Sequence, residues 1–341
     1  MHAWTSTWVA LVSMLLYTVC NASLRHLGDL QAPIEWSITV KETVAVVFLA
    51  PWIFFRLLRR RYRFQSKRLF LLLLVGALIC QVIGSQNQLF AYAVVGLIIA
   101  TPTLQACQLT ATALIGKYAL KDSISRSQWG AMALLLIAVL LLSLGKSADL
   151  TTFVENGSTI RTLQGIGASA LAALAFATYF NIVRYLMRKH RNHSLGAWES
   201  IRIHDWVGHN LATHPSQERR YSPFPITLLM ITVTGVGVLY YAPVVFLTRG
   251  GWEGFTNVPK ECWFWACLAG VTNLVGFFFQ IQALLLASAT KMSLIAAFQI
   301  VTFAVLGILF FGESMNMLIA VGVAFAIVGV FFSSQEAKSN R

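Results

Sequence analysis

Residues Gln86–Gly145 read QNQLFAYAVVGLIIATPTLQACQLTATALIGKYALKDSISRSQWGAMALLLIAVLLLSLG. The pattern predicts the end of one apolar helix, a second helix, a short charged turn and a third helix. Part of it returns near the C-terminus, where a Gln-containing pair, a Gly and an acidic residue recur at the same spacings. The two copies are Gln108–Leu109, Gly116 and Asp122–Ser123, and Gln299–Ile300, Gly307 and Glu313–Ser314. Polar residues at matching places in two otherwise apolar segments indicate an internal repeat, with Asp122 and Glu313 as its structural turns.

The composition around this stretch indicates a membrane protein. Of the 341 residues, 57% are hydrophobic and only 11% are charged. A soluble domain carries about 25% charged residues. Apolar runs long enough to cross a bilayer, each bounded by charges, Pro or Gly, recur along the whole chain. We therefore expect an all-α polytopic membrane protein whose surroundings are a lipid bilayer.

Ten transmembrane helices are expected from the apolar runs. They cover about 5–24, 35–56, 69–91, 94–115, 128–145, 164–187, 225–247, 263–286, 291–311 and 315–333. The third and fourth are split only near Gly96, and the eighth and ninth only near Ser288. Such tight connections require antiparallel hairpins.

The basic residues predict the orientation of these helices. A net charge of +13 would suggest nucleic acid for a soluble protein, but here the charges gather in connecting segments. Those segments follow the second, fourth and sixth helices, so they lie on one side if the helices alternate in direction. By the positive-inside rule that side is cytoplasmic, and both termini are cytoplasmic with it. No nucleic-acid partner is expected.

An odd number of helices in each half would make the second half cross the membrane in the opposite sense to the first. Inverted repeats of this kind are typical of alternating-access transporters. The expected organisation is a first five-helix repeat at 1–147, an external linker at 148–163, a second five-helix repeat at 164–335 with a cytoplasmic insertion at 190–222, and a tail at 336–341. The insertion is rich in histidine but shows no compact ligand spacing with a carboxylate, so we expect a solvated loop or surface helix and no metal site.

Lys41 and Glu42 stand out because charges within a spanning segment are costly and mark function by default. Glu42 points about 100° away from Lys41 around the helix, so Lys41 is expected to have no charged partner on its own face. It would then be free to meet a carboxylate or phosphate of a substrate, with Glu42 as its partner or as a proton carrier. The alternative is that the span begins nearer residue 38 and Lys41 extends its amine to the interface.

Amide and hydroxyl side chains concentrate in corresponding helices of the two halves. A lipid-facing amide would lack a hydrogen-bond partner, so these side chains are expected to point inward. They line a polar substrate cavity or, alternatively, hold helices together by hydrogen bonds. The candidates for substrate binding, beside Lys41, are Gln86, Asn87, Gln105, Gln108, Thr112, Asn273, Gln280 and Gln299.

These features resemble the drug/metabolite transporter superfamily, which includes the EamA-type exporters and the nucleotide-sugar transporters. FFGESMNMLIAVGVAFAIVGVFF, residues 310–332, is similar to the EamA ending, a Gly-Glu turn followed by a glycine-bearing helix. Residues Gln86–Asn87, Gln105, Gln108–Leu109 and Gln128–Trp129 are similar to the nucleotide-sugar branch. Thr110 departs from that branch, which usually has a lysine directly after the Gln-Leu pair. The resemblance implies ten helices in two inverted halves.

The expected function is secondary transport of a small polar or amphipathic organic metabolite by alternating access, with a coupling ion or a counter-substrate left open. One alternative is a nucleotide-sugar antiporter, and another is a non-transporting scaffold or receptor that uses the 190–222 loop. No nucleophile and base constellation, phosphate loop or zinc signature is present, so we expect neither an enzyme nor a cofactor. The plasma (inner) membrane is the expected location, or a Golgi or ER membrane for the nucleotide-sugar alternative.

Overall fold

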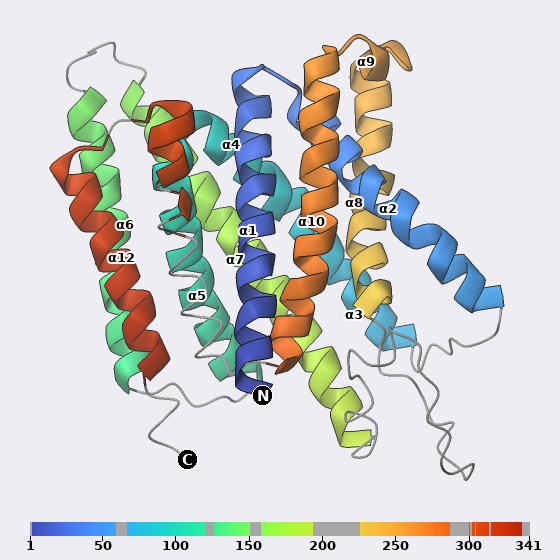
Figure 1. Cartoon of the computed structure of the whole chain (residues 1–341), viewed down its shortest axis with the longest axis horizontal. Coiled ribbons are helices and arrows are strands. Elements are labelled where there is room, and N and C mark those ends of the chain that lie inside the picture. Colours follow the sequence, from blue (N-terminus) through green and yellow to red (C-terminus); the bar gives the residue numbers. More distant parts are fainter. Residues whose placement is uncertain are drawn as a thin grey trace.

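The computed structural model describes residues 2–58, 67–120, 126–150, 158–193, 226–286, 300, 302–303, 305–313 and 315–335. Within these ranges the regular structure is helical throughout, as Figure 1 shows. The helices are α1 (His2–Asp29), α2 (Ile34–Leu58), α3 (Lys67–Leu78), the π-helix η1 (Ile79–Ser85), α4 (Gln86–Val95), α5 (Leu97–Leu120), α6 (Arg126–Leu150), α7 (Ser158–His193), α8 (Ile226–Thr248), α9 (Glu253–Thr256), α10 (Lys260–Leu286) and α12 (Met317–Gln335). Residues 305–311 form a further helical piece ahead of α12. The all-α prediction is confirmed for the part of the chain described.

Several of these helices are long and apolar enough to cross a membrane. Within the described ranges there are six such segments, and Trp129–Leu142 and Met317–Gly329 are shorter apolar helices. The six are Ile34–Phe55, Lys67–Val95, Leu97–Ala119, Ile160–Leu186, Leu228–Thr248 and Lys260–Ile281. The chain is thus a multi-pass membrane protein by helix length and composition. The count of ten spans and the inverted repeat stay predictions.

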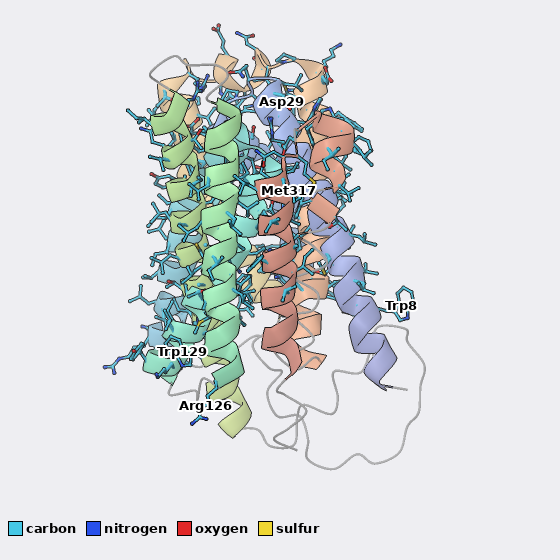
Figure 2. All side chains as sticks on the ribbon, turned by 90° about the vertical axis from the view of Figure 1, so that its left-hand side faces the viewer. Trp8, Asp29, Arg126, Trp129 and Met317 are labelled. Carbon is cyan, nitrogen blue, oxygen red and sulfur yellow. The ribbon has the colours of Figure 1, made fainter. Side chains whose placement is uncertain are left out.

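The outer surface fits lipid surroundings. Leu136, Leu140 and Leu144 all lie on α6, and all three side chains are largely exposed. A water-soluble helix would carry polar residues on such a face. Figure 2 shows α6 along its length, with Arg126 and Trp129 near one end of the helical bundle. Asp29 and Met317 lie toward the opposite end, and we name the two the Arg126 end and the Asp29 end.

The predicted split near Gly96 is confirmed. Helix α4 ends at Val95 and α5 begins at Leu97, and Gly96 between them has φ 77°. That backbone region favours glycine because a Cβ atom would clash there. One residue is therefore enough to reverse the chain direction. The predicted split near Ser288 lies outside the described residues.

The third predicted helix, 69–91, differs from expectation because it is interrupted. Helix α3 gives way to the π-helical turns of η1, and α4 then continues in the same direction. The hydropathy pattern could not reveal this change, because residues 79–85 are mostly apolar whichever backbone hydrogen-bond pattern they adopt. Helix boundaries also differ, since α7 already begins at Ser158, inside the segment expected to be a linker.

Small residues allow close packing of α6 against α12. A Cβ atom on Gly322 would approach the Ala138 carbonyl oxygen to 3.2 Å, and one on Gly329 would approach the Ala131 carbonyl oxygen to 3.2 Å. Ala131 and Gly322 are separated along the chain by the same number of residues as Gln108 and Gln299, and so are Ala138 and Gly329. Helices α6 and α12 therefore contribute corresponding residues to this contact, as a two-fold repeat requires.

Two further contacts also rely on a glycine. Gly84 in η1 packs against Phe176 of α7, and Gly276 of α10 packs against Leu16 of α1. Close approach of backbones through small residues is how helices pack inside membranes.

Candidate functional site

A buried ion pair lies at the centre of the site. The Lys41 Nζ atom is 2.8 Å from Glu42 Oε1, and the two side chains are 7% and 1% exposed. The prediction that Lys41 has no charged partner is therefore wrong. The long lysine stem bends back to its sequence neighbour because two opposite charges attract strongly in a medium of low dielectric. The amine is buried in protein, which does not fit a side chain extending to the interface.

The pair is surrounded by residues from several helices. We name them, with the pair, the Lys41–Glu42 cluster. Its other members are Tyr17 and Cys20 on α1, Cys80 and Gln81 on η1, Tyr179 on α7, and Gly237 and Tyr241 on α8. Residues from both halves of the chain thus meet at one pair of charges.

Gly237 makes room for this arrangement. A Cβ atom at this position would lie 2.9 Å from Glu42 Cγ and 3.1 Å from Gln81 Cδ. Both distances are shorter than ordinary van der Waals contacts. Helix α8 can therefore approach the ion pair only because residue 237 has no side chain.

The π-helix places its polar groups toward α8. Gln81 Nε2 donates to the Val233 carbonyl oxygen at 3.1 Å, and Ser85 Oγ donates to Gln81 Oε1 at 2.8 Å. The Tyr241 hydroxyl donates to the Gln81 carbonyl oxygen at 3.0 Å. A π-helical turn changes the backbone hydrogen-bond pattern, and such turns are frequent at functional sites. Neither Gln81 nor Tyr241 is among the site residues predicted from the sequence, and the π-helix was not expected.

Two oxygens in the cluster lack a hydrogen-bond partner among the described residues. They are Glu42 Oε2 and the Tyr179 hydroxyl, and both are buried. Buried polar atoms in native proteins are nearly always paired, so exceptions call for a functional explanation. The cluster therefore combines paired groups, at Lys41 and Gln81, with two buried oxygens that have no partner among the described residues.

The predicted site residues differ in their contacts and burial. Gln86 reaches the cluster, because the Tyr241 hydroxyl is 3.5 Å from Gln86 Oε1. Asn87 donates instead to the Ile83 carbonyl oxygen of its own helical turn. The remaining candidates among the described residues are half-buried: Gln105, Gln108, Thr112, Asn273 and Gln280. Gln299 lies outside the described residues.

One of these candidates takes part in helix packing through its backbone. Asn181 Nδ2 on α7 lies 3.4 Å from the Thr112 carbonyl oxygen of α5, and donates to the Ala177 carbonyl oxygen at 2.8 Å. This contact is an interhelical hydrogen bond of the kind that joins membrane helices. The Gln280 side chain differs, since its Oε1 atom is buried without a partner in the part described.

Glu313 has a defined role beyond that of a turn. Its carboxylate accepts hydrogen bonds from the backbone N–H groups of Leu97 and Ile98, each at 2.8 Å. These are the first amides of α5, which have no partner within their own helix. The Arg25 Nε atom lies 3.8 Å from Glu313 Oε1. A carboxylate from the second half thus caps a helix of the first half at the Asp29 end.

Two glycines leave room for the Glu313 carboxylate. A Cβ atom on Gly96 would lie 2.5 Å from Glu313 Oε1, and one on Gly307 would lie 2.9 Å from Glu313 Oε2. Gly307 is one of the repeated glycines, so this contact explains its recurrence near an acidic residue. Asp122, the matching acid of the first half, lies outside the described residues.

A separate groove of about 760 Å³ lies between α2, α8, α9 and α10. Its lining is almost wholly apolar and includes Phe48, Phe246, Trp252 and Trp263, which are all exposed. Such a surface suits lipid rather than a polar metabolite. In the described part of the chain no three His, Cys, Asp or Glu side chains lie close enough to hold a metal ion.

Comparison with known proteins agrees with transport. Residues 216–335 match the EamA-like transporter family. A protein from Sinorhizobium sp, described as an uncharacterized transporter in the cobO 3' region, is 28% identical over 94 residues. This match covers 28% of the present chain and 67% of that relative.

A solved structure described only as "Crystal structure of protein" is similar over 97% of this chain and 98% of that chain, with a TM-score of 0.59 and 12% identity. At that identity the likeness concerns the fold alone. The family match concerns the second half, where the Gly-Glu turn and the glycine-bearing helix were noted in the sequence. Over residues 216–335 the chain is similar to the EamA-like transporter family, in agreement with the resemblance noted in its sequence.

Proposed function

We propose that the protein is a secondary transporter that moves a small organic metabolite with an anionic group by alternating access. The observation that carries this proposal is the Lys41–Glu42 cluster. An ion pair buried in a membrane protein is costly to desolvate, and it contributes little to stability compared with apolar residues of similar volume. The ion pair is therefore better explained by a role in function than by a role in stability.

The position of the cluster supports the same proposal. Lys41 and Gln81 come from the first half of the chain, whereas Tyr179 and Tyr241 come from the second. Transporters built from two repeats bind their substrates where the repeats meet. The paired glycine contacts of α6 with α12 support a two-fold relation between the halves.

Lys41 is the group that would hold the substrate. Its ammonium carries three donors and a compact charge, which suits a carboxylate or a phosphate oxygen. The polar atoms of Gln81, Tyr179 and Tyr241 would surround the rest of the molecule. The helices have to move before a substrate reaches Lys41, since its side chain is buried in this conformation.

Uptake into proteoliposomes tests the proposal. The purified protein is screened with amino acids, nucleotides and nucleotide sugars, and uptake is compared with that of the double variant Lys41→Met/Glu42→Gln. We expect uptake of one anionic compound class, and loss of it in the double variant. Lys67→Met is the matched control, because Lys67 is exposed at the start of α3. Equal uptake by the double variant, or transport of none of these compounds, would contradict the proposal.

A further inference from the structure

We infer that Glu42 is a proton-coupling site: it takes up a proton when an anionic substrate replaces it as the partner of Lys41. This inference rests on the proposed function and adds the identity of the coupling ion. It concerns Glu42 rather than Lys41, and it follows from the contacts of the two carboxylate oxygens.

The first step is competition for one ammonium group. Glu42 Oε1 is 2.8 Å from Lys41 Nζ, so the carboxylate occupies the place that a substrate anion would need. An anion that binds Lys41 must therefore displace Glu42 or share the ammonium with it. Sharing would bring two anions together in a buried site, which strongly favours neutralising one of them.

The second step is the environment of the displaced carboxylate. The ionisable groups that interact with Glu42 come from every side of the cluster: Tyr17 and Cys20 on α1, Lys41 on α2, Cys80 on η1, Tyr179 on α7 and Tyr241 on α8. Of these groups Lys41 alone is basic. Once Lys41 binds the substrate, no other member of this set can balance the charge of Glu42. A buried ionised carboxylate without a counter-charge binds a proton instead.

The third step concerns the second carboxylate oxygen of Glu42. Its Oε2 atom is buried and lacks a hydrogen-bond partner among the described residues, and the Tyr179 hydroxyl in its surroundings lacks one too. A protonated carboxyl has an O–H donor that the carboxylate lacks. We assign the Tyr179 oxygen as the acceptor for that donor, because it too is buried without a partner among the described residues.

The charges balance over a full cycle. A proton from the aqueous phase bonds to a Glu42 oxygen while the Lys41 ammonium, which keeps its own protons, pairs with the substrate anion. When the substrate leaves on the other side, Glu42 releases its proton to water there and the ion pair with Lys41 forms again. One proton therefore accompanies each substrate anion in the same direction.

Proteoliposomes with an entrapped pH-sensitive dye test this inference on the full-length protein. The probe is the anionic compound found by the uptake screen. We expect its addition to wild-type vesicles to acidify the interior, and an inward proton gradient to drive its accumulation. Glu42→Gln should lose both responses, to the level of protein-free vesicles. Glu253→Gln is the matched control, because Glu253 is exposed on α9.

Each result decides a separate point. Substrate uptake by the wild type without any pH change would overturn the proton inference and leave the transport proposal standing. Proton movement that persists in Glu42→Gln would also overturn it. The wild-type measurement does not depend on whether the variant folds. Absence of uptake of every compound would contradict the transport proposal, and the proton inference with it.

Discussion

Glu42 Oε1 lies 2.8 Å from Lys41 Nζ. Because the two side chains form an ion pair, a substitution at either residue changes the electrostatic balance of the other. A lysine without a partner could be replaced by an apolar residue at little cost. A lysine that neutralises a buried carboxylate cannot, because its removal leaves an uncompensated charge. The sequence showed the two charges, but helix geometry alone suggested that they point apart. The flexible Lys41 side chain nevertheless reaches Glu42, because opposite charges attract strongly in a medium of low dielectric.

We expect Lys41→Met to lower the free energy of unfolding by about 3–5 kcal/mol, because Glu42 is left buried and unpaired. The double variant Lys41→Met/Glu42→Gln should recover most of this loss, since no charge remains. Thermal or denaturant unfolding in detergent measures both variants. A double variant no more stable than the single one would argue against the pairing.

Gly237 offers a second test at the residue scale. Gly237→Ala should destabilise the protein by about 1–3 kcal/mol, because the new methyl group would be forced against Glu42 and Gln81. The matched control is Gly235→Ala on the same helix, where a Cβ atom would meet nothing within 4 Å. The comparison uses the same unfolding measurement. Equal effects of the two substitutions would show that α8 does not approach the ion pair closely.

At the scale of helices, the contact between Glu313 and α5 ties the two halves together at the Asp29 end. The repeat of an acidic turn was visible in the sequence, whereas its target was not. Almost every residue has a backbone N–H group, so no sequence pattern can show that the amides of Leu97 and Ile98 donate to this carboxylate. The positive φ of Gly96 was also needed to bring the start of α5 into position.

We expect Glu313→Ala to cost about 0.5–2 kcal/mol of stability, the range for loss of a helix-capping side chain. The reason is that two α5 amides lose their acceptor. Unfolding experiments with Glu253→Ala as the control measure the difference, because Glu253 is an exposed acid at a helix start. A loss no greater than that of the control would mean that Glu313 does not cap α5.

At the scale of the whole molecule, the helical membrane fold could be predicted from the apolar runs and the low charge. The site could be predicted only in part. Lys41 and Gln86 were found because polar residues are conspicuous in apolar segments. Tyr17, Tyr179 and Tyr241 were missed because a tyrosine in a membrane helix is common and does not by itself indicate a site. Their meeting depends on helix packing, which a single sequence does not contain.

The orientation of the helices in the membrane can be tested as well. In a cysteine-free background, Lys67→Cys and Trp252→Cys should react with a membrane-impermeant thiol reagent from opposite sides of the membrane. The two residues lie at the start of α3 and beside α9, and both are exposed. The basic residues predict that Lys67 is on the cytoplasmic side. Reaction of both from the same side would contradict the fold as well as the orientation.

Alternating access requires that the Lys41–Glu42 cluster is exposed to water from each side of the membrane in turn. Cys80 reports on this directly, because its thiol is buried in the cluster. The other free cysteines, Cys20, Cys107, Cys262 and Cys267, are replaced by alanine, and a membrane-impermeant thiol reagent is applied to proteoliposomes from either side. We expect Cys80 to react from both sides, and more slowly from both when the transported compound is present. Reaction from one side only, or from neither, would contradict alternating access at this site.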